Sequence, residues 1–151
     1  MSGSNLKVRS YTAADEDEAI ELWRRTWQEA YPDIDFEKRV VWWRERWLQE
    51  LVPNAKILVA EMDGVLEGFV TVDPKNGYLD QIAVAPEFWG SNVAGLLLDA
   101  GKRISPARLD LLVNKDNARA IAFYEKHGFV MAGDDVNPTS GKPVFRMRWR
   151  P

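Results

Sequence analysis

Three residues near the end of the chain are spaced so that one face of a helix would carry them all. Asn117, Ala120 and Tyr124 stand at positions i, i+3 and i+7, which recur on the same side of an α-helix. That face offers a ligand an amide, a gap left by a small side chain, and a phenol. Taken singly, Asn117 can be a simple helix N-cap and Tyr124 a half-buried core residue.

A second segment, from Ile82 to Leu98, is typical of a strand, a tight turn and a helix. Its turn is built from small residues, namely Gly90, Ser91, Asn92, Ala94 and Gly95. Small residues let a ligand approach the backbone closely. The first-turn N–H groups of the following helix, with the positive end of its dipole, favour a phosphate or pyrophosphate there. An ordinary strand-to-helix turn has a similar pattern, and neither a dinucleotide-binding glycine fingerprint nor a P-loop is present.

Together the two segments resemble the signature motifs of the GCN5-related N-acetyltransferase (GNAT) family, and the resemblance follows nearly the whole chain in element order. The family pattern Asn-x-x-Ala-x-x-Phe-Tyr, followed by Gly-Phe, is matched by Asn117, Ala120, Phe123, Tyr124, Gly128 and Phe129. The pattern that cradles the CoA pyrophosphate, Gln/Arg-x-x-Gly-x-Gly/Ala, is covered by Trp89, Gly90, Ser91, Asn92, Val93 and Ala94. Trp89 replaces the usual Gln or Arg, and Asn92 replaces the first Gly.

The resemblance implies that the cofactor is acetyl-CoA, released as CoA. The implied cofactor-binding residues are Ile82, Ala83 and Val84, whose backbone would pair with the pantetheine arm, with Trp89, Gly90, Ser91, Asn92, Val93, Ala94, Gly95, Asn117, Tyr124 and Lys126. Asn tolerates a left-handed backbone better than any residue but Gly, so the turn can survive Asn92. Because the turn carries no basic side chain, Lys126 or Arg119 would have to meet the phosphate charge, although each can equally be a solvated helix charge.

The implied reaction is direct transfer of an acetyl group to an amine. An alkyl amine titrates near 10.4, so deprotonating it at pH 7 costs roughly 4–5 kcal/mol. Asp80 is the only carboxylate on the strand that would face the thioester, and we predict it as the base, unless it is an ordinary polar strand residue. The resemblance places Tyr124 to hydrogen-bond or protonate the departing thiolate.

The acceptor is expected to be a small-molecule or peptide amine. In this family the loop between the first two helices lines the acceptor site, so Trp27 and Tyr31 are the predicted substrate residues. Trp23, Trp43 and Trp47 are predicted to be core residues, because helical spacing of aromatics is typical of core packing. His127 is interpreted as a surface or capping residue.

The elements that would position these residues follow from hydrophobic patterning and turn signals. Strands are expected at residues 6–11, 57–62, 66–72, 78–84, 109–113, 129–132 and 144–149, and helices at 13–30, 36–52, 93–103 and 118–127. In the fourth strand Leu79 and Ile82 differ in parity, which a β-bulge near Asp80 would reconcile; a strand buried on both faces needs no bulge. We predict an α/β (α+β) fold of one domain, residues 1–151, with a GNAT-type mixed central β-sheet of about seven strands and helices on both faces.

Composition excludes several other classes of function. The chain has no Cys and one His, so it cannot form a disulfide, a thiolate nucleophile or a Cys-ligated zinc site, and we expect no metal. A net charge of −3 gives no reason to expect nucleic acid or membrane as a partner. The polar first five residues predict no signal peptide, so we expect a cytoplasmic protein. Many relatives pair, so a homodimer is an option, and a non-catalytic acyl-CoA-binding or interaction domain of the same fold is the alternative function.

Overall fold

The computed structural model describes residues 6–138 and 140–151; the five residues on which the signal-peptide prediction rests lie outside this part. The strands are β1 (Leu6–Ser10), β2 (Lys56–Met62), β3 (Val65–Asp73), β4 (Tyr78–Val84), β5 (Leu109–Asn114), β6 (Val130–Val136) and β7 (Pro143–Trp149). The helices are α1 (Glu16–Ala30), α2 (Val40–Arg46), α3 (Val52–Asn54), α4 (Val93–Ile104) and α5 (Ala118–Lys126), with 3-10 turns at Ala13–Asp15 and Pro86–Phe88 and a π-helical turn at Trp47–Leu51.

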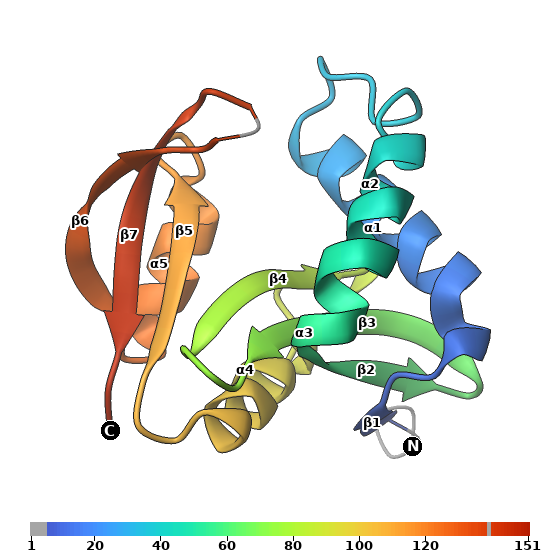
Figure 1. The fold of residues 1–151 in the computed structure, drawn as a ribbon, viewed down its shortest axis with the longest axis horizontal. Coiled ribbons are helices and arrows are strands. Elements are labelled where there is room, and N and C mark those ends of the chain that lie inside the picture. Colours follow the sequence, from blue (N-terminus) through green and yellow to red (C-terminus); the bar gives the residue numbers. More distant parts are fainter. Residues whose placement is uncertain (1–5, 139) are drawn as a thin grey trace.

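The seven strands form one mixed sheet in the order β1-β2-β3-β4-β5-β7-β6. All neighbours are antiparallel except β4 and β5, which run parallel. Figure 1 shows the sheet opening between these two, so that β1–β4 with α1–α4 form one lobe and β5–β7 with α5 form the other. The predicted mixed sheet is therefore present.

Helices cover both faces of the sheet, as predicted, so the sheet divides the core into two clusters. One cluster packs α1 and the α2 region against β3, with Trp23, Trp43 and Trp47 at its centre. These three side chains are at most 4% exposed, which confirms that they belong to the core. The other cluster packs α4 and α5 against the opposite face, with Leu97 and Leu98 fully buried.

Local sequence signals explain most element boundaries. The Asp63-Gly64 turn between β2 and β3 has φ of 52° and 82°, the positive values that a tight hairpin of this type requires. The single helix predicted over 36–52 is wrong in detail: it begins at Val40, contains the π-helical turn, and passes through Pro53 to Asn54. Pro53 lies in α3 directly after the π-helical turn, and as a proline it donates no backbone hydrogen bond there. Strand β6 also runs to Val136, further than the predicted 129–132.

Candidate active site

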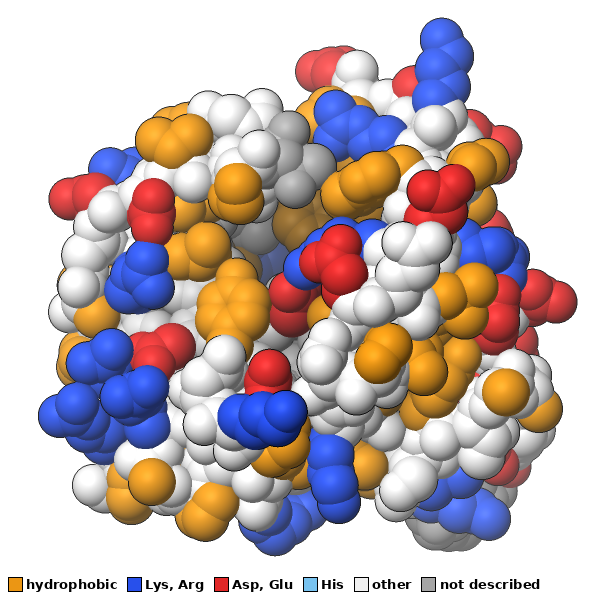
Figure 2. Space-filling model, viewed as in Figure 1, with side chains coloured by type: hydrophobic (Ala, Val, Ile, Leu, Met, Phe, Trp, Pro, Cys, Tyr) orange, Lys and Arg blue, Asp and Glu red, His pale blue; other side chains and the backbone are white. Residues whose placement is uncertain are grey.

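Strands β4 and β5 separate just beyond their first paired residues. Tyr78 and Asp110 are the one aligned pair between them, and the Asp110 N–H donates to the Gly77 carbonyl at 2.9 Å. Beyond Tyr78, the edge of β4 that faces β5 therefore has no strand partner among the described residues. The molecular surface is hollowed between the two lobes in the same view (Figure 2). A parallel sheet that opens in this way leaves backbone groups available to an extended ligand.

The β4 bulge that the sequence predicted as one of two alternatives is present at Asp80. Gln81 and Leu79 oppose consecutive residues of β3, which leaves Asp80 as the extra residue. The Gln81 N–H donates instead to Thr71 Oγ1 at 3.1 Å. Bulges change the direction in which a strand presents its side chains, and this one separates the paired start of β4 from its open end.

Asp80 forms a two-point ion pair with Arg46, which sequence analysis did not anticipate. Arg46 Nη1 donates to Asp80 Oδ1 at 2.9 Å, and Nη2 donates to Oδ2. Both side chains are largely shielded from solvent, being 22% and 14% exposed. Protonation of Asp80 would remove the negative charge that strengthens these two bonds, so its predicted role as base is a hypothesis that the ion pair weakens. The 34 residues between the partners explain why no sequence signal pointed to the pair.

The turn between β4 and α4 takes its shape from Gly90. This residue has φ of 83°, whereas Asn92 has φ of −86°. The tolerance of Asn92 for a left-handed backbone is therefore not used here, because Gly90 supplies the left-handed residue. A Cβ built on Gly90 would meet nothing within 4 Å, so the turn is open to a ligand. The first-turn amides of α4, at Val93 and Ala94, follow directly.

Trp89 folds back over the end of β4. Its indole Nε1 donates to the Val84 carbonyl at 2.8 Å, and Thr26 Oγ1 donates to the same oxygen at 3.3 Å. Of the Ile82–Val84 backbone predicted to pair with pantetheine, the Val84 carbonyl is thus already engaged. The face of the Trp89 ring carries the Arg119 guanidinium, whose central carbon lies 4.3 Å from the ring centroid.

Asn117 precedes α5 and Tyr124 lies in its last turn, and each has the structural role that the sequence left open for it, a helix N-cap and a buried residue of the core. Asn117 Oδ1 caps the helix by accepting the Ala120 N–H at 3.2 Å, and the side-chain NH₂ has no hydrogen-bond partner among the described residues. Tyr124 is 8% exposed and packs in the cluster that contains Leu79 of β4 and Leu111 of β5. Its hydroxyl makes no hydrogen bond within the described part of the chain. Burial raises the pKa of the Tyr124 phenol, so it keeps its proton at neutral pH.

The predicted substrate residues lie at the end of α1, where the lobes are joined. Trp27 and Tyr31 stack with centroids 5.7 Å apart. The Tyr31 hydroxyl donates to Asp116 Oδ1 at 2.8 Å and accepts from Asn114 Nδ2 at 2.9 Å, so α1 is tied to the end of β5. Lys142, from the β6–β7 loop, covers the Tyr31 ring at 4.8 Å. Burial raises the pKa of Tyr31 to about 12, and the phenol is therefore neutral.

The remaining predicted residues differ in their surroundings. Lys126 is exposed at the end of α5, with no ion pair among the described residues. His127 is the C-cap of α5, as interpreted from sequence. It also packs on α4: a Cβ on Gly95 would lie 3.3 Å from the imidazole. Burial of the imidazole is the main reason why the pKa of His127 is lowered.

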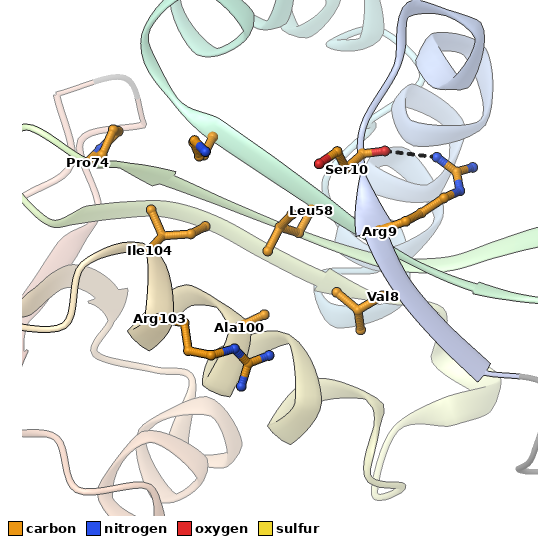
Figure 3. Close-up of a pocket in the computed structure, with 9 residues that line it drawn as sticks. Val8, Arg9, Ser10, Leu58, Pro74, Ala100, Arg103 and Ile104 are labelled. Carbon is orange, nitrogen blue, oxygen red and sulfur yellow. Dashed lines mark hydrogen bonds between the residues drawn. The ribbon is translucent and has the colours of Figure 1, made fainter.

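Two cavities are lined by residues of β1, β2 and the helices next to them. The larger, of about 470 Å³, is enclosed by β1, β2 and the second half of α4, with Leu58, Ala100 and Arg103 in its wall (Figure 3). The smaller, of about 300 Å³, lies beside Tyr11 and Leu48. Neither is lined by a predicted site residue. No helix in the described part is long and apolar enough to cross a membrane.

Comparison with known proteins places these features in a family. The acetyltransferase (GNAT) family pattern matches residues 16–129, three quarters of the chain and both motif segments. The chain belongs to this family. With the GNAT family come its reaction class, N-acetyl transfer, and its acetyl donor, acetyl-CoA, so the predicted family, enzyme class and cofactor are confirmed.

Individual relatives of this GNAT chain are distant. Peptidyl-lysine N-acetyltransferase YjaB of Salmonella typhimurium is 24% identical, over 91% of this chain and 92% of its own length. Mycothiol acetyltransferase of Propionibacterium freudenreichii is 32% identical over 67% of this chain, but the chain spans only 36% of that protein. The crystal structure of PaiA N-acetyltransferase from Thermoplasma acidophilum in complex with coenzyme A has a TM-score of 0.80 and 23% identity, covering 97% of this chain and 99% of that one. This last likeness confirms the fold class.

Proposed function

We propose that this chain transfers an acetyl group from acetyl-CoA directly to an amine, in the opening between β4 and β5. The observation that carries the proposal is the separation of the two strands after the Tyr78–Asp110 pair. Beside this opening lies Tyr124, a buried phenol whose hydroxyl has no partner among the described residues. A phenol in this position can donate a hydrogen bond to a departing thiolate.

The residues around the opening suit the proposed cofactor. The β4 edge beyond Tyr78 can accept the amide-bearing pantetheine arm as an added strand. The open turn at Gly90, followed by the first amides of α4, can hold the pyrophosphate. Acetyl-CoA, when bound, supplies a thioester carbonyl that an amine can attack. The fit supports Asn117 as the donor to the arm through its free side-chain NH₂.

The transfer needs stabilisation of the departing thiolate and loss of a proton from the amine. Tyr124 donates a hydrogen bond to the sulfur as the carbon–sulfur bond breaks, because burial keeps the phenol protonated. The amine must lose a proton at a cost of roughly 4–5 kcal/mol at pH 7. Since both Asp80 oxygens accept from Arg46, we assign this proton to water at the open edge rather than to Asp80. In this proposal Asp80 positions Arg46 beside the β4 bulge.

We propose that the acceptor is a primary amine on a slender chain, either a small alkylamine or a lysine side chain of a peptide. The Tyr31–Asp116 hydrogen bond ties the lobes together on the side where the family admits its acceptor. A thin chain can pass the stacked rings of Trp27 and Tyr31, whereas a bulky amine would have to break this link.

The decisive experiment measures free thiol released from acetyl-CoA in the presence of four amines. These are an alkylamine, an amino acid, a peptide with a free N-terminus, and an N-blocked peptide with one lysine. Thiol release with an acetylated product, lost in Tyr124→Phe, supports the proposal. Calorimetric binding of acetyl-CoA without turnover of any amine would favour the alternative, a non-catalytic acyl-CoA-binding domain. Cytoplasmic localisation and homodimerisation remain predictions, which cell fractionation and light scattering test.

A further inference from the structure

The turn that precedes α4 contains no positive charge of its own. Residues 90–95 are Gly, Ser, Asn, Val, Ala and Gly, and the nearby Glu87 pairs with Arg25 at 3.0 Å. A pyrophosphate carries its charge on exposed oxygens, and backbone amides with a helix dipole meet it only in part. A guanidinium is the side chain that best fits such oxygens, because it offers several N–H groups in one plane.

One such guanidinium lies beside the turn, delivered from the other lobe. Arg119 of α5 rests on the ring of Trp89, 4.3 Å from its centroid, and Trp89 immediately precedes Gly90. The ring is itself held in place by the indole bond to Val84. Arg119 has no carboxylate partner among residues 6–138 and 140–151, whereas most arginines of the lobe that contains the turn are ion-paired. Its charge is therefore available to a ligand.

From this juxtaposition we propose that Arg119 binds the cofactor pyrophosphate and that Trp89 is the positioning residue that holds it there. The inference rests on the proposed function and extends it. Trp89 stands where the family has Gln or Arg, so an aromatic ring in the turn, together with an arginine across the opening, replaces a polar side chain in the turn itself. Lys126 lies two helical turns further along α5 and is not part of this proposal.

The test is calorimetric affinity of the purified protein for CoA, 3′-dephospho-CoA and pantetheine. Arg119→Ala should lower the affinity for CoA and for 3′-dephospho-CoA by the same factor, about 10- to 100-fold. This is the range expected for losing a charge-assisted hydrogen bond. Affinity for pantetheine, which has no pyrophosphate, should not change. Arg103→Ala, an exposed arginine at the far end of α4, is the matched control for lost charge and should bind all three like the parent.

Each other outcome overturns part of the inference. A loss confined to CoA would assign Arg119 to the 3′-phosphate, and parent-like affinity for all three would remove it from the site. A parent protein that binds no CoA would instead refute the proposed function itself. Circular dichroism of Arg119→Ala, an exposed residue, checks that the fold is kept.

The role of Trp89 is tested separately. Trp89→Phe keeps a ring face and loses the bond to Val84, whereas Trp89→Leu loses both. The affinity of the leucine variant for CoA should be about two- to fivefold lower than that of the phenylalanine variant, which is the usual range for an exposed cation–π contact. This difference should vanish when Arg119 is also alanine. A difference that persists in the Arg119→Ala background would show that Trp89 acts through packing alone.

Discussion

Removing one oxygen atom from Tyr124 separates its chemical role from its packing role. Tyr124→Phe keeps the ring, which packs against Phe123 and Phe129 with centroids 5.4 and 5.5 Å away. The hydroxyl has no hydrogen-bond partner among the described residues, so its loss breaks no contact within the chain. Deleting a shielded polar atom without a partner is close to neutral for stability. The free energy of unfolding should therefore change by less than about 0.5 kcal/mol.

The effect on catalysis should be much larger. A phenol titrates near 10 and a thiol near 8.5, so full transfer to the thiolate is uphill by roughly 2 kcal/mol at reference values, and burial raises the phenol further. A strong hydrogen bond in the transition state is then the main contribution. Its loss should lower kcat by about 10- to 10³-fold, with a smaller rise in KM for acetyl-CoA. Thiol release at saturating acetyl-CoA, with the best amine of the panel, measures both.

Tyr11→Phe is the matched control, because it should give the opposite result. The Tyr11 hydroxyl accepts a hydrogen bond from Trp47 Nε1 at 3.0 Å, and Trp47 is fully buried. The variant leaves that indole N–H without a partner, so it should lose about 1–3 kcal/mol of stability and keep the parent kcat. Parent-like turnover in Tyr124→Phe, with a lowered melting temperature, would refute the assignment of the phenol as donor.

Three further perturbations test other parts of the site and fold. In the parent, acetyl-CoA at 100 times its Kd should stabilise the fold by about 2.7 kcal/mol and so raise the melting temperature. Ala94→Leu should abolish this rise at millimolar acetyl-CoA while the apo protein stays folded. An unchanged rise would show that the pyrophosphate does not bind at Ala94. Asp80→Asn should cost about 1–3 kcal/mol through the broken Arg46 pair and keep the parent pH–rate profile; a loss of 10²-fold or more that shrinks at high pH would make Asp80 the base. The Arg9 guanidinium lowers the pKa of Asp15 to about 2 from 3.8, so this carboxylate should stabilise the fold by on the order of 2 kcal/mol above pH 3.8 and lose that contribution as pH falls through about 2; Asp15→Asn should show a shallower acid transition in unfolding titrations.

Much of the site could be read from sequence because its signals are local. The cap at Asn117, the phenol at Tyr124 and the small-residue turn before α4 each depend on a few neighbouring residues. The parity change between Leu79 and Ile82 likewise indicated the bulge. The sequence did not say which residue of the turn is left-handed, because Gly90 and Asn92 both tolerate that conformation and only the folded turn selects one of them.

The sequence by itself determined the element order, the two motifs and the family, since hydrophobic period and motif spacing are properties of consecutive residues. The tertiary structure alone decided which distant side chains meet: Arg46 with Asp80, Arg119 with Trp89, and Tyr31 with Asp116. These pairs are 34, 30 and 85 positions apart, and each joins elements whose relative placement depends on how the sheet opens after Tyr78. Charge and aromatic character are written in the sequence, but a contact also needs distance and direction, which arise only when both faces of the sheet are packed.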